Sequence, residues 1–147
     1  MKLGEKSRVK IETFFREHFS DAGFVLPEIY FHSGRFTRIV TSALKIEGIT
    51  VGKRIFILPA SFWTSEKQNL RLDEGLVVHE VTHVLQYRRD GFFRFFRFYL
   101  TSYFAYLRRQ KKWDAFARTE AYLQIPYEVE ARENASRFVA WSRSRKN

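Results

Sequence analysis

The chain has 147 residues, of which 45% are hydrophobic, and 26 basic against 16 acidic side chains give it a net charge of +10. This length predicts one domain over residues 1–147, and the apolar fraction excludes a disordered chain. The absence of cysteine excludes a disulfide framework and a thiolate metal site. The first residues lack the apolar core of a signal peptide, and no uncharged run reaches the length of a membrane span. Cytoplasmic localisation is therefore the default expectation, with a non-classical export route left open.

The first quarter of the chain is predicted to hold a helix followed by a strand. Apolar residues recur at helical spacing over residues 7–19, which predicts an amphipathic helix. Asp21-Ala22-Gly23 ends this N-terminal segment, residues 1–23. Residues 28–31 are typical of a short strand, and residues 36–44 fit a short helix slightly better than a strand.

A β-hairpin is predicted next. Residues 49–51 and 54–58 pair naturally across Gly52-Lys53, and Pro59 ends the second strand. The edge of this hairpin near Arg54 to Leu58 could pair with an extended substrate backbone, because an open edge invites strand addition. Residues 60–71 are expected to form a loop.

His79-Glu80-Val81-Thr82-His83 is the most informative stretch of the chain. On a helix, residues four apart lie on one face, so both imidazoles can bind one metal ion. Asp73 and Glu74 suit the start of such a helix, and Gly91 suits its end. The plain alternative is a buried helix with two hydrogen-bonded histidines and a surface Glu80. Burying two histidines beside a carboxylate is costly without a partner, and a metal ion is the simplest partner.

A catalytic metal site needs a third protein ligand, which must be a carboxylate because no histidine follows His83. The best segment is residues 125–135, where Pro126 suits the first turn of a new helix. Glu128 and Glu130 are two residues apart, so only one of them can point at the metal. For either residue the plain alternative is a solvated carboxylate near a helix N-terminus.

The segment from Phe92 to Leu107 holds nine aromatic residues: Phe92, Phe93, Phe95, Phe96, Phe98, Tyr99, Tyr103, Phe104 and Tyr106. Phe92, Phe96, Tyr99, Tyr103 and Leu107 share one predicted helical face. The favoured interpretation is a helix that packs across the motif helix and supplies core and part of a substrate cleft. A membrane-surface helix and a protein-partner surface are the two alternatives.

Basic residues crowd the second half of the chain: Arg88, Arg89, Arg108, Arg109, Lys111, Lys112, Arg143, Arg145 and Lys146. They predict a surface for nucleic acid, anionic lipid or an acidic substrate, weighed evenly against a solvated surface with no dedicated partner. The sequence shows no signature of a nucleic-acid-binding module. Residues 143–147 are expected to form a frayed basic tail.

The motif resembles the zincin superfamily, on the branch whose third zinc ligand is a glutamate on a second helix. That branch often carries Glu-x-x-Ala-Asp, and Glu128-Val129-Glu130-Ala131-Arg132 matches its Glu and Ala. The resemblance therefore favours Glu128 over Glu130 as the ligand. Arg132 departs from the pattern, whose Asp usually orients a ligand histidine, and Glu130 or Asn134 could substitute for it.

A more specific resemblance covers residues about 29 to 91. Three segments follow one another in order: residues 29–34, 49–57 and 79–86. This series resembles the H-E-x-x-H metallopeptidase domain associated with extracellular contractile injection systems. The resemblance implies zinc and the fold more strongly than it implies a substrate.

These features predict a single-domain α+β zincin-like fold, with a small, mostly antiparallel sheet packed on the motif helix and further helices around it. The predicted function is zinc-dependent hydrolysis of a peptide bond in a peptide or protein substrate. His79, His83 and Glu128 would hold Zn²⁺, and Glu80 would act as general base on the metal-activated water. Candidate donors to the oxyanion are Tyr103, Tyr122 and Tyr127.

The alternative is a non-catalytic zincin-fold module for binding or assembly. Its basic, aromatic surface would contact nucleic acid, an anionic membrane or a protein partner, and the arginine at position 132 favours it. A third possibility is a peptidase that acts on a protein bound to nucleic acid.

Overall fold

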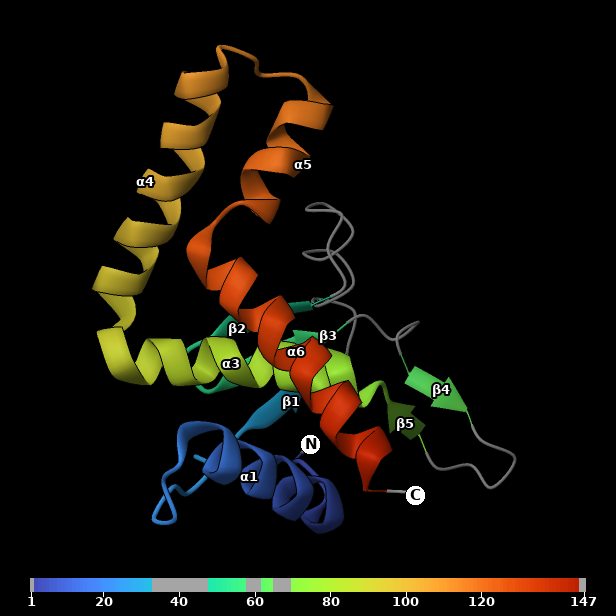
Figure 1. Cartoon of the computed structure of the whole chain (residues 1–147). Helices are drawn as coiled ribbons and strands as arrows, with labels where there is room; N and C mark the ends of the chain where they lie inside the picture. Colours follow the sequence, from blue (N-terminus) through green and yellow to red (C-terminus); the bar gives the residue numbers. More distant parts are fainter. Residues whose placement is uncertain (1, 33–47, 58–61, 65–69, 146–147) are drawn as a thin grey trace.

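The computed structural model describes residues 2–32, 48–57, 62–64 and 70–145 (Figure 1). The elements in chain order are α1 (Glu5–Phe19), β1 (Tyr30–His32), β2 (Gly48–Val51), β3 (Arg54–Ile57), β4 (Phe62–Thr64), β5 (Leu70–Leu72), α3 (Glu74–Asp90), α4 (Phe92–Gln110), α5 (Ala115–Leu123) and α6 (Pro126–Ser144). The predicted α+β class is confirmed. Among the described residues, no helix is long and apolar enough to cross a membrane.

A mixed three-stranded sheet has the strand order β1-β3-β2. The predicted hairpin is confirmed, since β2 pairs antiparallel with β3 across a turn in which Gly52 has φ of 61°. β1 pairs with the other side of β3 in parallel, with Phe31 opposite Ile55. The expectation of an open edge near Arg54 to Leu58 is therefore wrong for β3. A strand from earlier in the chain already occupies that edge.

A second, two-stranded sheet corrects the loop expected over residues 60–71. β4 and β5 pair antiparallel, with Trp63 opposite Arg71. Each strand has three residues, which is too short to show the two-residue alternation that identifies a strand in sequence. The segment 36–44 lies outside the described residues.

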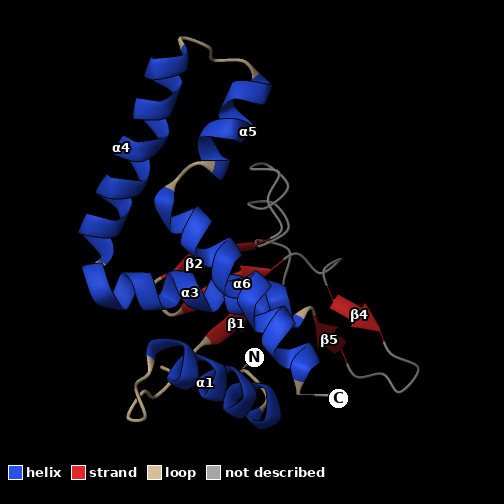
Figure 2. Ribbon diagram, in the orientation of Figure 1, coloured by secondary structure: helices blue, strands red, loops and turns tan. Residues whose placement is uncertain are grey.

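α3 lies between the three-stranded sheet and α6, and α1 lies below α3 and β1 in the view of Figures 1 and 2. The main core joins these elements and contains Ile11, Phe14, Phe15, Leu26, Ile29, Phe31, Ile55, Ile57, Val77, Val78, Val81, Val84 and Phe138. Phe14 of α1 meets Phe138 of α6 edge-on, with ring centroids 5.3 Å apart. The core therefore fixes α6 in position over α3.

α4 and α5 form a helical hairpin that projects from this body (Figure 1). Phe95 and Leu107 are buried, and Tyr99 and Tyr103 are partly buried. The predicted inward face is shifted, because Phe92 and Phe96 remain 46% and 45% exposed. α4 turns away from α3 at Gly91, whose φ is 77°. It contacts the motif helix as predicted, through Phe92 and Phe95 against Tyr87, and its later part packs on α5.

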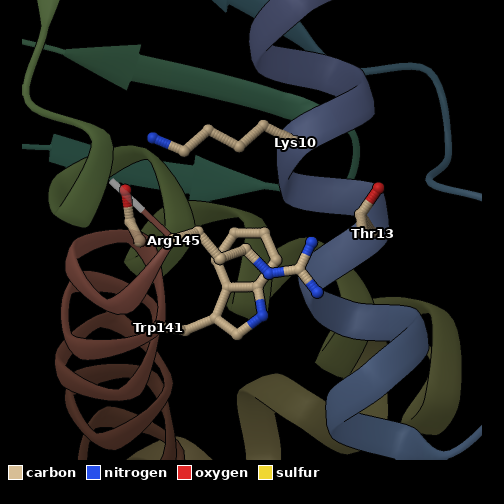
Figure 3. Close-up of a pocket in the computed structure, with 5 residues that line it drawn as sticks. Lys10, Thr13, Trp141 and Arg145 are labelled. Atoms are coloured by element: carbon tan, nitrogen blue, oxygen red, sulfur yellow. The ribbon is translucent and has the colours of Figure 1, made fainter. Parts of the chain in front are cut away.

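A hollow of about 300 Å³ lies between α1 and α6 and is lined by Lys10, Thr13, Trp141, Ser142 and Arg145 (Figure 3). Its two cations have acidic partners, since Lys10 bonds to Glu74 at 2.5 Å and Arg145 bonds to Glu17. Arg145 also lies over the Trp141 ring, 4.6 Å from its centroid. The Arg145–Glu17 contact ties the end of α6 to α1, and α6 extends to Ser144, within the segment expected to fray.

Candidate metal centre

The two histidines of the motif are brought together by the backbone of α3. Asp73 caps this helix as predicted, because its carboxylate accepts hydrogen bonds from the backbone N–H groups of Gly75 at 2.7 Å and Leu76 at 3.1 Å. His79 and His83 follow one turn apart, and their Nε2 atoms lie 3.2 Å from each other. Both imidazoles therefore direct a ring nitrogen to one point.

Glu128 of α6 completes this cluster. Its carboxylate oxygens lie 3.3 Å from His79 Nε2 and 3.4 Å from His83 Nε2, and the residue is 3% exposed. One ligand atom from each of the three residues lies within 4.8 Å of the others, so they can hold a metal ion. Two imidazole nitrogens and one carboxylate oxygen form a donor set that suits zinc. Glu130 instead turns to Gln86 and Arg89.

The charges in this cluster depend on one another. Burial alone would raise the pKa of Glu128, but hydrogen bonds and charges from His79 and His83 hold that pKa far below its usual range. Burial would lower the pKa of His83, yet the hydrogen bond and charge of Glu128, the charge of Glu80 and the Gln86 hydrogen bond together raise it. Glu128 is therefore an anion at neutral pH and available as a ligand.

Two tyrosines from the α4–α5 hairpin hydrogen-bond to the same carboxylate. Tyr99 donates to Oε1 of Glu128 at 3.0 Å, and Tyr122 donates to Oε2 at 2.8 Å. Burial, followed by the charge of Glu128, raises the pKa of both hydroxyls, so both stay protonated donors. Tyr122 was among the expected oxyanion donors, whereas Tyr99 was missed.

The other two expected oxyanion donors lie elsewhere. Tyr127 donates its hydroxyl to Asp90 at 2.8 Å. Tyr103 packs in the apolar contacts between α4 and α5. The structure thus brings only Tyr122 of the three to Glu128.

The orientation of His83 depends on Gln86, which the sequence interpretation also missed. Gln86 Oε1 lies 2.8 Å from His83 Nδ1, so Nδ1 carries a proton and Nε2 is the ring nitrogen that can bind a metal ion. Gln86 Nε2 in turn donates to the Tyr127 carbonyl and to Glu130, each at 3.0 Å. The three-residue spacing from His83 to Gln86 was the available signal.

The two residues expected to substitute for the missing aspartate, Glu130 and Asn134, hydrogen-bond to neighbours of His83 in α3. Glu130 contacts Gln86 and not a histidine. Asn134 donates to Thr82 Oγ1 at 3.4 Å, and Arg132 donates to the Leu123 carbonyl oxygen.

Glu80 is directed toward the sheet. It is 4% exposed, which excludes the surface glutamate of the plain alternative. Thr50 of β2 donates its hydroxyl to Glu80 Oε2 at 2.5 Å and is itself buried. This contact joins the motif to the hairpin, and nothing in the local sequence around Thr50 indicated it.

The eCIS core domain family, named for extracellular contractile injection systems, matches residues 2–91. The chain belongs to this family. Searches of curated proteins and of solved structures gave no match. The matched segment of the eCIS core domain contains α1, the sheets and α3 with its motif, whereas Glu128 and the two tyrosines lie beyond it. The resemblance to the injection-system domain is confirmed, and the zincin likeness stays a prediction.

Proposed function

We propose that this eCIS core domain protein is a zinc-dependent peptidase of the zincin class. The observation that supports it most is the buried Glu128 carboxylate of α6, which meets the Nε2 atoms of both motif histidines. His79, His83 and Glu128 would hold the ion. Bound zinc would polarise the scissile carbonyl and lower the pKa of a water molecule toward neutrality.

Glu80 is the proposed general base. It follows His79 directly in the motif, and its negative charge is one of the causes that raise the pKa of His83. Thr50 occupies one carboxylate oxygen and leaves the other to accept a proton from the attacking water. Glu80 would then deliver that proton to the leaving amine.

Tyr99 and Tyr122 are the proposed positioning residues for Glu128. Each donates to a different carboxylate oxygen, so together they fix the plane of the carboxylate. Of the three expected oxyanion donors, only Tyr122 lies beside the cluster. Its one hydroxyl proton is donated to Glu128, so it would have to release that bond before it could donate to developing negative charge.

The first experiment measures metal content. The purified wild-type protein should carry about one zinc per chain, since two imidazoles and one carboxylate form a catalytic-type site. His79→Ala and His83→Ala should lose the metal, and His32→Ala, a histidine of β1 outside the cluster, should keep it. Full zinc in both motif variants would disprove the assignment.

The second experiment separates a peptidase from a binding module. Glu80→Gln keeps the shape of the side chain and removes the base, so it should retain zinc and fold while turnover drops by about two orders of magnitude or more. The assay uses a broad set of peptides and unfolded proteins. If wild type and variant cleave equally well, Glu80 is not the base; if neither cleaves anything, the binding module is the better interpretation.

A further inference from the structure

The exposed side of α4 carries both apolar and cationic side chains. Its members follow at spacings of one, three or four residues and therefore share one broad helical face. We call them the α4 stripe: Phe93, Arg94, Arg97, Leu100, Phe104 and Arg108. All six are exposed, and Phe93 is 87% exposed. The opposite side of α4 packs on α5, α3 and α6.

The stripe continues onto the end of the hairpin. Trp113 follows α4, is 55% exposed and lies beside Phe104 with ring centroids 6.4 Å apart. Lys111 and Lys112 sit next to it and are exposed. The hairpin thus ends in an aromatic pair beside cations, at the part of the molecule that projects furthest from the body (Figure 2).

The charge of the stripe narrows the range of partners. α4 contains four arginines and no acidic residue, so a second copy of the same face would be repelled. A nucleic acid would pair with the arginines but would leave Phe93, Leu100 and Phe104 in water along its backbone. An anionic bilayer meets both requirements, because arginines reach the lipid phosphates while apolar side chains enter the headgroup boundary.

We propose that the α4 stripe, together with Trp113, docks on the surface of an anionic lipid bilayer. α4 then lies in the plane of the membrane, with its apolar side chains about 5–10 Å into the interface. Trp113 sits at the headgroup level, where amphipathic rings are favoured. This proposal is independent of the peptidase activity, since none of its residues contacts the metal centre.

Co-sedimentation with vesicles tests the two components of the stripe. The full chain should bind phosphatidylcholine vesicles that contain about one-third phosphatidylserine, and binding to pure phosphatidylcholine should be much weaker. The triple variant Arg94→Gln/Arg97→Gln/Arg108→Gln should lose about a hundredfold in partition, at about fivefold for each cation. The matched control Lys6→Gln/Arg137→Gln/Arg143→Gln removes the same charge from exposed sites on α1 and α6 and should bind like wild type.

The apolar component distinguishes a membrane from other anionic partners. Phe93→Ser/Leu100→Ser/Phe104→Ser should lose binding to the same vesicles at equal net charge. Unchanged vesicle binding by this variant would mean purely electrostatic adsorption and would overturn the proposal. Full competition between a DNA duplex and the vesicles for wild type, or dimerisation of wild type through the stripe, would also overturn it.

A fluorescence measurement on otherwise unmodified protein avoids any loss of folding in the triple variants. Lipids brominated near the headgroup should quench Trp113, and the quenching should disappear in Trp113→Phe, which retains Trp63 and Trp141. Equal quenching in wild type and Trp113→Phe, or no quenching in either, would overturn the docking orientation.

Discussion

The segment that matches the eCIS core domain, residues 2–91, and the segment after it hold the candidate metal centre by different means. In the first segment, His79 and His83 meet through the repeat of one helix, and Glu80 is fixed by Thr50 from the adjacent hairpin. In the second, Glu128 and its two tyrosine donors come from three separate helices. The first segment holds two of the proposed ligands and the proposed base, and the second holds the third proposed ligand. A family match to the first segment alone therefore describes an incomplete centre.

The largest expected effect comes from the residue that joins the two segments. Phe138 of α6 is 1% exposed in the core built mainly by the first segment. Phe138→Ala should lower the free energy of unfolding by about 3–5 kcal/mol because it leaves a cavity. Urea denaturation measures this, with Phe93→Ala as the exposed control at under about 0.5 kcal/mol. Equal effects of the two changes would mean that the segments are not joined there.

The next effect distinguishes the two glutamates of the second segment. Glu128→Ala should weaken zinc binding by more than about a hundredfold, beyond the range seen on removing residues that only orient a ligand. Glu130→Ala should stay within about tenfold, because Glu130 contacts Gln86 and Arg89 rather than a histidine. Competition with a chelator measures both constants. The reverse ranking would assign Glu130 as the ligand.

A smaller effect is expected from the orientation of His83 within the first segment. Gln86→Leu removes the acceptor for His83 Nδ1 and should weaken zinc binding by about 10- to 100-fold. Gln110→Leu, at the exposed end of α4, is the matched control and should not change it. An unaltered affinity in Gln86→Leu would show that the histidine is oriented without this partner.

Removing a tyrosine donor tests how Glu128 is held by the second segment in metal-free protein. Tyr99→Phe leaves one buried oxygen of Glu128 with one donor fewer, so the free energy of unfolding should fall by about 2 kcal/mol. Tyr103→Phe, at a partly buried tyrosine that packs between α4 and α5, is the control. Denaturation of both variants without metal gives the comparison, and equal losses would remove the assigned role of Tyr99.

The smallest effect concerns the junction of the segments at alkaline pH. Burial raises the pKa of Tyr87 from 10.0 to about 12, so the folded state binds this proton more tightly than the unfolded state. The resulting stability is present below pH 10 and is lost as the pH rises through about 12. At pH about 11, wild type should have lost about 1 kcal/mol more than Tyr87→Phe, relative to neutral pH. If the free energy of unfolding of the two proteins changed in parallel with pH, the raised pKa of Tyr87 would be contradicted.

The features that the sequence predicted correctly have local causes. The cap at Asp73, the end of α3 at Gly91 and the hairpin turn at Gly52 each depend on residues within a few positions of one another. Pro126 at the start of α6 belongs to the same class. The position of Glu128 beside the histidines follows the Glu-x-x-Ala register, which the zincin resemblance supplied.

The features that the sequence could not predict depend on contacts between distant segments. The pairing of β1 with β3 closed an edge that the hairpin alone would leave open. Thr50 contacts Glu80 and Tyr99 contacts Glu128 from other elements. No local sequence pattern predicts contacts between residues so far apart in the chain. The inward face of α4 shifted for the same reason, because α4 packs on α5 as well as on the motif helix.

The separation of Glu128 from α3 by two helices also has a consequence for synthesis. The ribosome completes α3 first and must still make α4 and α5 before the first turn of α6 emerges. Throughout that interval a nascent chain offers two histidines without the carboxylate that completes the donor set. The order of translation therefore delays assembly of the whole centre until α6 is made, and a chain cut short before α6 would be left with an incomplete site.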